Sequence, residues 1–346
     1  FTAGPKWLGV DAPETRAITP ALALQVTGWL VWLAGAHLHQ DVAVAGVLLA
    51  AAGLGTQNGR FWRLWRASRV PDRVHATVVA LGGTLGALCA AGIGVALLLG
   101  EWSVALALVH TALWGFIVAT YVSVAHRMIP FFTSGVLPMI EVWRPFWVLW
   151  LMLAAAVLQV LAVWLDWLGL PASAAGPAWG VVHGTLQLVI GGVLVWLACV
   201  WGLVQSLKNR LLAMLHIGFL WLGLAFLLGG LSRWLAWGYG MGTLGLGALH
   251  ALTMGCLASL MLAMVTRVSC GHSGRALVAD HTAWTLFWLL QVATVLRIAA
   301  EVPGVFGIAW VWVLPVAAFL WAATMGVWGV RLGRWYGCLR ADGRPG

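Results

Sequence analysis

Long apolar stretches separated by short polar connections make up almost the whole chain. At a rise of about 1.5 Å per residue, each stretch is long enough to cross a hydrocarbon core about 30 Å thick. The pattern predicts ten spanning helices, over residues 19–38, 42–60, 74–99, 103–126, 146–168, 178–205, 211–236, 244–266, 282–300 and 306–330. We therefore expect an all-α, polytopic transmembrane helical bundle that forms a single integral membrane domain over residues 1–346.

The composition agrees with this prediction and excludes a soluble fold. Hydrophobic residues make up 62% of the chain and charged residues only 8%, whereas soluble domains carry about 25% charged residues. The mean hydropathy is +0.95. The polar connections are too short to hold a folded domain of their own.

The basic residues predict the orientation of the spans. If the N-terminus is placed on one side of the membrane and ten spans alternate, all 19 lysines and arginines except Arg233 and Arg297 fall on that side. Positively charged loops stay in the cytoplasm, so both ends of this chain are expected to be cytoplasmic. The net charge of +9 then reflects topology and contact with anionic membrane lipid, and gives no reason to expect nucleic acid.

The cysteines and carboxylates limit which classes of reaction and cofactor the sequence supports. None of the five cysteines stands in a CxxC spacing, which argues against a disulfide framework and against covalent attachment of haem. The predicted spans hold no paired carboxylates and no Ser/His/Asp arrangement, so hydrolysis is poorly supported. The missing carboxylates also count against a proton-coupled transporter and, more weakly, against a proton-consuming reductase.

Ten histidines in so apolar a chain are the clearest chemical signal. Neutral imidazole suits a metal or haem ligand, although a lone membrane histidine often only bonds to a neighbouring helix. The predicted topology assigns five to the periplasmic half: His37, His39, His110, His183 and His250. The other five fall in the cytoplasmic half: His75, His126, His216, His272 and His281.

Depth separates the predicted ligands into two groups. His216 and His250 differ in depth by roughly 14 Å, whereas two axial nitrogens on one iron are about 4 Å apart. These two histidines are therefore not expected to bind the same iron. The expected groups are His110, His183 and His250 near the periplasm, and His75, His216 and either His126 or His272 near the cytoplasm.

Other side chains near the histidines extend these groups. Met254 follows His250 by four residues and shares its helix face. Three roles are open for it: a soft ligand for Cu(I), an axial haem ligand, or a side chain that only packs. Residues 126–133 end a span at a predicted proline stop, Pro130, and residues 266–275 form a predicted polar turn. Three arginines on the cytoplasmic side suit haem propionates or are ordinary topogenic residues: Arg127, Arg267 and Arg275.

Three segments together resemble the NnrS family. Residues 248–255, running on to 264–267 and 271–275, are similar to its central signature, residues 127–133 to a second motif, and residues 215–221 to a third. The resemblance implies a bacterial inner-membrane protein linked to denitrification and nitric oxide stress, containing haem and copper. It implies about twelve spans in the complete protein, so the first two, with a His-Glu-Met motif, are expected to be missing before residue 1. His126 stands where the family usually has glycine.

The expected function is therefore a haem- and copper-binding membrane protein of nitric oxide detoxification that acts on nitric oxide at a metal centre. The alternatives are a non-catalytic protein that binds nitric oxide or metal, and a b-type cytochrome subunit for electron transfer linked to quinol. The expected cofactors are haem b and copper. The expected partners are nitric oxide or a related small molecule, membrane lipid, and an electron donor that is a quinol or a cytochrome.

The topology can be tested with fusion reporters. A reporter fused after Arg334 should read as cytoplasmic, and reporters inserted near Glu101 or Asp166 should read as periplasmic. The opposite reading at either insertion would show that a span has been missed, because one missed span inverts everything after it.

Overall fold

The computed structural model describes residues 3–137, 139, 141–240, 242–302 and 310–343. These residues form helices joined by short connections, and no strand occurs among them. Ten helices are long and apolar enough to cross a membrane. The predicted all-α, polytopic bundle and its number of spans are confirmed.

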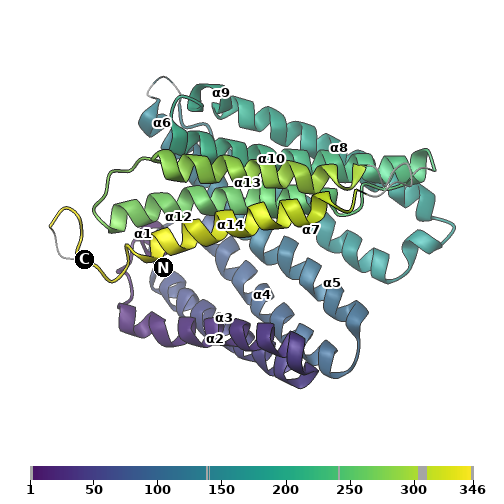
Figure 1. The fold of residues 1–346 in the computed structure, drawn as a ribbon, viewed down its shortest axis with the longest axis horizontal. Coiled ribbons are helices and arrows are strands. Elements are labelled where there is room, and N and C mark those ends of the chain that lie inside the picture. The colour runs from purple at the N-terminus through teal and green to yellow at the C-terminus, as the bar shows by residue number, and fades with distance from the viewer. Residues whose placement is uncertain (1–2, 138, 140, 241, 303–309, 344–346) are drawn as a thin grey trace. The chain divides into compact units, whose positions relative to one another are not determined.

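The ten spans follow one another along the chain with short connections (Figure 1). They are α2 (Thr15–Leu38), α3 (Gln40–Ala67), α4 (Val74–Leu98), α5 (Trp102–Ala112) continued by the π-helix η1 (Leu113–Val118) and α6 (Ala119–Val136), α7 (Phe146–Trp167), α8 (Gly176–Val200), α10 (Arg210–Arg233) continued by the π-helix η3 (Trp234–Gly238), α11 (Gly247–His250) continued by the π-helix η4 (Ala251–Ala258) and α12 (Ser259–His272), α13 (His281–Ala299), and α14 (Val313–Gly333). Three short helices lie between or before them: α1 (Ala3–Leu8), η2 (Leu170–Ala172) and α9 (Leu203–Ser206).

The helices group into two compact units. The first contains Phe1–Arg127 and Arg144–Leu170, and the second contains Met128–Trp143 and Pro171–Gly346. The boundary falls inside α6, so this helix contributes its first part to one unit and its last part to the other. A single integral membrane domain stays a prediction.

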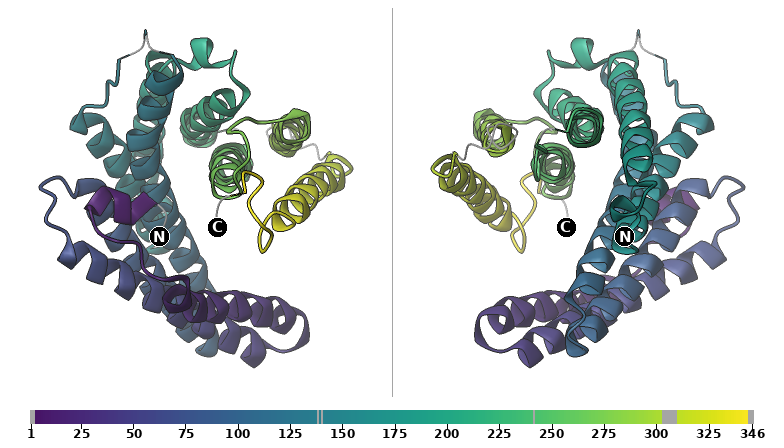
Figure 2. Two further views of the ribbon diagram at one scale, coloured as in Figure 1. Left: turned by 90° about the vertical axis from the view of Figure 1, so that its left-hand side faces the viewer. Right: turned by 90° about the vertical axis from the view of Figure 1, so that its right-hand side faces the viewer.

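Glycines hold the first unit together at the hairpin of α2 and α3, the adjacent purple helices of Figures 1 and 2. A Cβ atom on Gly46 would overlap the backbone nitrogen of Trp32, and one on Gly28 would overlap that of Ala50. The two backbones therefore touch directly. In lipid, where apolar side chains gain little by leaving the solvent, such close approach supplies the packing energy between helices.

A polar network links the helices of the second unit. Its central helix, α10, is the most buried of the described spans and packs against α8, α11, η4 and α12. The indole nitrogen of Trp221 donates to the side-chain oxygen of Gln291 at 2.7 Å. The amide nitrogen of Gln291 donates to the hydroxyl of Ser259 at 2.9 Å. Polar side chains of α10, α13 and α12 thus satisfy one another's hydrogen-bonding groups where no water is expected.

Two predicted helix ends are wrong, and both helices run further. Pro130 does not stop α6, which continues to Val136. Proline removes one backbone donor, but membrane helices tolerate it where neighbouring helices pack around the freed group, and Pro130 is buried. Residues 266–272, predicted as part of a turn, belong to α12. The turn begins at Ser273, and Gly274 takes the left-handed conformation with φ +69°.

The glycine contact predicts a difference between two substitutions on the same helix. Gly46→Ala should lower the stability of the purified protein by about 1–3 kcal/mol, because the added methyl meets backbone that no rotamer change can move. Gly59→Ala should have little effect, since nothing lies within 4 Å of its added Cβ. Thermal unfolding in detergent measures both. Equal midpoints for the two variants would contradict the direct backbone contact.

Candidate functional site

His216 and Thr133 form a buried hydrogen bond in the second unit. Both side chains are 0% exposed, and the Thr133 hydroxyl lies 2.9 Å from Nε2 of His216. That hydroxyl donates its own proton to the carbonyl of Ile129 at 2.8 Å, so it can only accept from His216. His216 therefore carries its proton on Nε2 and a lone pair on Nδ1. Nδ1 has no hydrogen-bond partner among the described residues.

Three of the sequence segments that carry the family resemblance meet at this bond. Thr133 belongs to residues 127–133 and His216 to residues 215–221. Next to Thr133, the guanidinium of Arg267 lies over the ring of Phe132, 4.1 Å from the ring centroid. Arg267 belongs to the segment over residues 264–267. The end of α6 therefore places His216 and Arg267 in one region of the second unit.

His250 lines a cavity of about 510 Å³ in the same unit. Its Nδ1 donates to the carbonyl of Leu246 at 2.9 Å, which leaves the lone pair on Nε2. Met254 shares the cavity wall with His250, as predicted from their spacing. The cavity also contains Arg297, which forms an ion pair with Glu301 at 2.5 Å. A histidine nitrogen, a thioether and a partly compensated guanidinium therefore face one space.

π-helical segments follow two of the predicted ligands. His250 directly precedes η4, which contains Met254, and His110 lies three residues before η1. The imidazole of His110 is half-buried in the first unit, and its Nδ1 donates to the carbonyl of Leu106 at 3.1 Å. π-helical turns are rare and frequently occur at functional sites. The π-helical backbone beside His250 and His110 is therefore a second reason, besides imidazole chemistry, to treat both as candidate site residues.

His183 is the least satisfied histidine of the second unit. It is 0% exposed on α8, and neither ring nitrogen has a hydrogen-bond partner among the residues that the structure describes. Its ring stacks on Trp179, with centroids 5.1 Å apart. An unpaired buried donor costs about 1–3 kcal/mol, so His183 remains a candidate ligand on chemical grounds.

In the first unit, His126 fixes the orientation of His75. Nε2 of His126 donates to the carbonyl of Pro145 at 3.1 Å, so its Nδ1 accepts from Nε2 of His75 at 3.0 Å. The lone pair of His75 is then on Nδ1, which has no partner in the described part of the chain. Trp7 packs edge-on against His75, and the guanidinium of Arg127 lies over Trp7, 5.2 Å from the ring centroid. The first unit thus contains its own imidazole with a free nitrogen.

The NnrS protein family model matches residues 1–340. The chain belongs to the NnrS family. No curated protein and no solved structure matches it. Membership makes the chain a nitric oxide-related membrane protein, and the residues of the two units must indicate where its chemistry takes place.

The remaining predicted ligands of this NnrS chain lie nearer the surface. His272 is exposed at the end of α12, and Arg275 is exposed beyond it, stacked on Trp335. His37 and His39, which are not among the predicted ligands, are exposed where α2 meets α3. No group of three or more His, Cys, Asp or Glu residues able to hold a metal occurs among the described residues. Among the described residues, the buried or half-buried histidines therefore lie singly, except for the hydrogen-bonded pair His75 and His126.

Sequence reasoning missed the residues that position these imidazoles. Thr133 and the carbonyl of Pro145 carry no ligand chemistry of their own, so nothing in the sequence singled them out for this role. Arg297 did have a signal, because it is one of only two basic residues on the side of the membrane that the charge bias leaves almost uncharged. The predicted grouping of His110 with His183 and His250 stays a prediction, since His110 belongs to a different unit.

The bond between Thr133 and His216 predicts a specific loss of stability. Thr133→Val keeps the shape but removes the acceptor, so a buried N–H is left unpaired at a cost of about 1–3 kcal/mol. Thr294→Val is the matched control: Thr294 is equally buried and donates to its own helix at 2.8 Å, yet accepts from no histidine. Thermal unfolding should show a clear loss for Thr133→Val, a much smaller one for Thr294→Val, and recovery in Thr133→Ser. Equal losses in the two valine variants would show that the hydroxyl does not serve His216.

Proposed function

We propose that this chain binds haem b through individual imidazoles and acts in the nitric oxide response at the bacterial inner membrane, with copper as a second metal. The observation that carries the proposal is the proton arrangement of the histidines. In His75, His216 and His250 a protein acceptor takes the N–H and leaves the other nitrogen with an unused lone pair. Metal-ligating histidines almost always have such a partner on the second nitrogen, because it fixes the tautomer and the ring orientation.

Single imidazoles favour haem over a site made only of protein ligands. A haem iron takes its equatorial ligands from the macrocycle and needs only one or two from the protein. Structural metal sites of zinc or similar ions need three or four protein ligands close together. The absence of CxxCH from the sequence makes covalent attachment unsupported, so the proposed haem is of the b type.

Arginines beside two of these histidines fit the acidic part of a haem. Arg267 lies next to the Thr133–His216 pair through Phe132, and Arg127 lies next to His75 through Trp7. A guanidinium at membrane depth needs an anionic partner, and haem propionates meet that need. When bound, haem would supply an iron that binds nitric oxide and changes oxidation state. The chain's own residues hold the imidazole, pair the acidic groups and exclude water.

Copper fits the cavity of His250 better than the other places. Imidazole nitrogen and thioether sulfur are both ligands of Cu(I), and His250 and Met254 line the same wall. Arg297 brings a positive charge that Glu301 partly compensates. The cavity has room for a small molecule beside the metal, since about 300–1,000 Å³ is usual for ligand pockets.

A b-type cytochrome that passes electrons from a quinol is the second candidate. His216 lies one and a half turns into α10, and His250 lies near the opposite end of the membrane path in α11–α12. Two centres at different depths suit electron transfer across the bilayer. A non-catalytic protein that binds nitric oxide needs only one of them. Consumption of nitric oxide by the reduced, purified protein distinguishes an enzyme from both alternatives.

The proposal is tested by the optical spectrum and metal content of the purified full chain. Wild-type protein from haem-sufficient cells should show a b-type spectrum that changes when nitric oxide is added. His216→Ala and His250→Ala should each remove a different component in part, and the double variant should lose both. His39→Ala, at an exposed position, is the control and should keep the full spectrum.

Haem, iron and copper must be measured per folded protein, because an unfolded variant loses everything without informing ligation. A monodisperse variant that retains full haem and copper would show that its histidine is no ligand. An iron-free wild-type preparation would overturn the proposal as a whole.

A further inference from the structure

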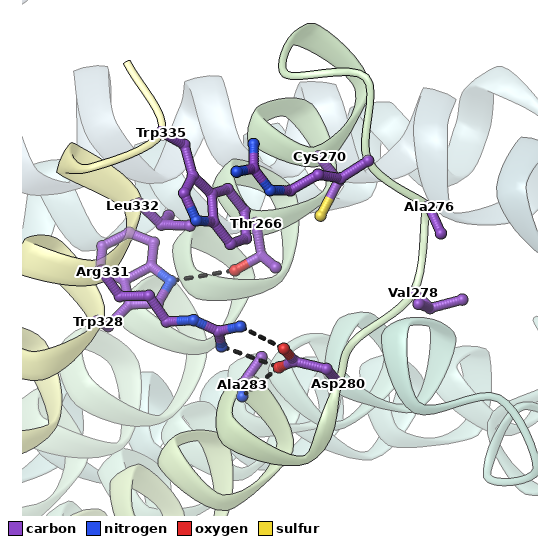
Figure 3. A pocket seen from close by; sticks show the side chains of 11 residues that line it. Thr266, Cys270, Ala276, Val278, Asp280, Ala283, Trp328, Arg331, Leu332 and Trp335 are labelled. Carbon is purple, nitrogen blue, oxygen red and sulfur yellow. Dashed lines mark hydrogen bonds and ion pairs between the residues drawn. The ribbon is translucent and has the colours of Figure 1, made fainter. Parts of the chain in front are cut away.

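A second pocket, of about 330 Å³, opens between the end of α12, the start of α13 and the end of α14 (Figure 3). Thr266 and Cys270 of α12 line one side, and Trp328, Arg331 and Trp335 line the side of α14. The loop before α13 closes it with Ala276, Val278 and Asp280. No histidine is among its lining residues, so this pocket offers no imidazole to a haem iron or to copper.

One of the pocket's two guanidinium groups is already neutralised. Arg331 forms two hydrogen bonds to the Asp280 carboxylate, drawn as dashed lines in Figure 3, one of them at 2.9 Å. These bonds lower the pKa of Asp280 to about 2. Asp280 also accepts from the backbone N–H of Ala283 and so caps α13. The pair is therefore a fixed, neutral part of the wall.

The other guanidinium, that of Arg275, has no acidic partner among the described residues. It stacks on Trp335 with its carbon 4.6 Å from the ring centroid. Within the described residues it makes no hydrogen bond and no ion pair. The stacking on the indole holds the planar group in place and leaves its N–H donors available. The pocket as a whole thus carries one uncompensated positive charge.

Apolar side chains surround that charge on the loop as well as inside the pocket. Leu277 and Val278 are 49% and 60% exposed, and Trp328 and Leu332 form part of the wall. Exposed apolar residues next to a spanning helix belong in the interfacial layer of a bilayer, where tryptophan also gathers. A fully hydrated ion gains nothing from such walls, whereas an amphipathic anion uses both the charge and the apolar surface.

We propose that this pocket binds the phosphodiester headgroup of an anionic membrane lipid, with Arg275 as the phosphate ligand. The planar guanidinium presents paired N–H donors that match two phosphate oxygens. Basic pockets between spanning helices on the cytoplasmic side are typical sites for anionic headgroups. The first carbons of the acyl chains would contact the apolar wall around Val278 and Trp328. The proposal is independent of haem and copper.

The test compares lipid retention by the full chain and two variants in native mass spectrometry, with phosphatidylglycerol as the probe. Arg275→Gln should bind phosphatidylglycerol about five- to tenfold more weakly, because it loses a charge-assisted pair. Arg334→Gln is the matched control. Arg334 is exposed at the end of α14, the helix that contributes Arg331 to the pocket wall, but Arg334 itself does not line the pocket. Arg275→Lys should fall in between, because lysine keeps the charge but not the paired donors.

Four results would overturn the proposal. Equal weakening in Arg275→Gln and Arg334→Gln would mean a diffuse positive surface. Displacement of the lipid by millimolar inorganic phosphate, or equal binding of phosphatidylcholine, would mean that a free anion or any phospholipid is accepted. Loss of haem in Arg275→Gln with unchanged lipid binding would assign Arg275 to a propionate instead. Unchanged size-exclusion elution and unchanged thermal unfolding midpoints establish that each variant is folded. Haem content, measured on the same samples, tests the haem proposal separately.

Discussion

A neutral imidazole surrounded by membrane helices must place one N–H and one lone pair where no water can serve either. This constraint organises the chemistry of both units. In His75, His216 and His250 the N–H is given to a fixed partner inside the protein, a histidine nitrogen, a threonine hydroxyl or a backbone carbonyl. The donor side is satisfied permanently, and the acceptor side remains for a ligand. The rings are therefore oriented before anything binds to them.

The continuation of α6 beyond Pro130 is what makes the arrangement at His216 work. A helix that stopped at the proline would release Phe132 and Thr133 into a loop. Because the helix continues to Val136, Thr133 presents its hydroxyl to His216 and Phe132 presents its ring to Arg267. One turn of helix thereby connects residues from three distant parts of the sequence, and a polar contact and an aromatic contact reinforce each other.

The arginines near the predicted ligands differ in what compensates them. Arg297 is paired with Glu301, and Arg331 is paired with Asp280. Arg267 and Arg275 meet aromatic rings instead. A ring stabilises a guanidinium without using its N–H donors, so the charge stays available for an external anion. This difference separates arginines whose charge is neutralised by a carboxylate from arginines that stack on an aromatic ring.

The sequence by itself determined the number of spans, the all-α class and the histidines that are candidate ligands, because hydrophobic length and the rarity of polar side chains in lipid are local properties. It also placed Met254 beside His250, since four residues along a helix share a face. Only the tertiary structure decided that His75 pairs with His126, that Thr133 holds His216, and that Arg297 shares a cavity with His250. These pairings join residues far apart in the chain. Which nitrogen of an imidazole remains free depends on what the other nitrogen meets, and that partner is supplied by the packing of helices against each other.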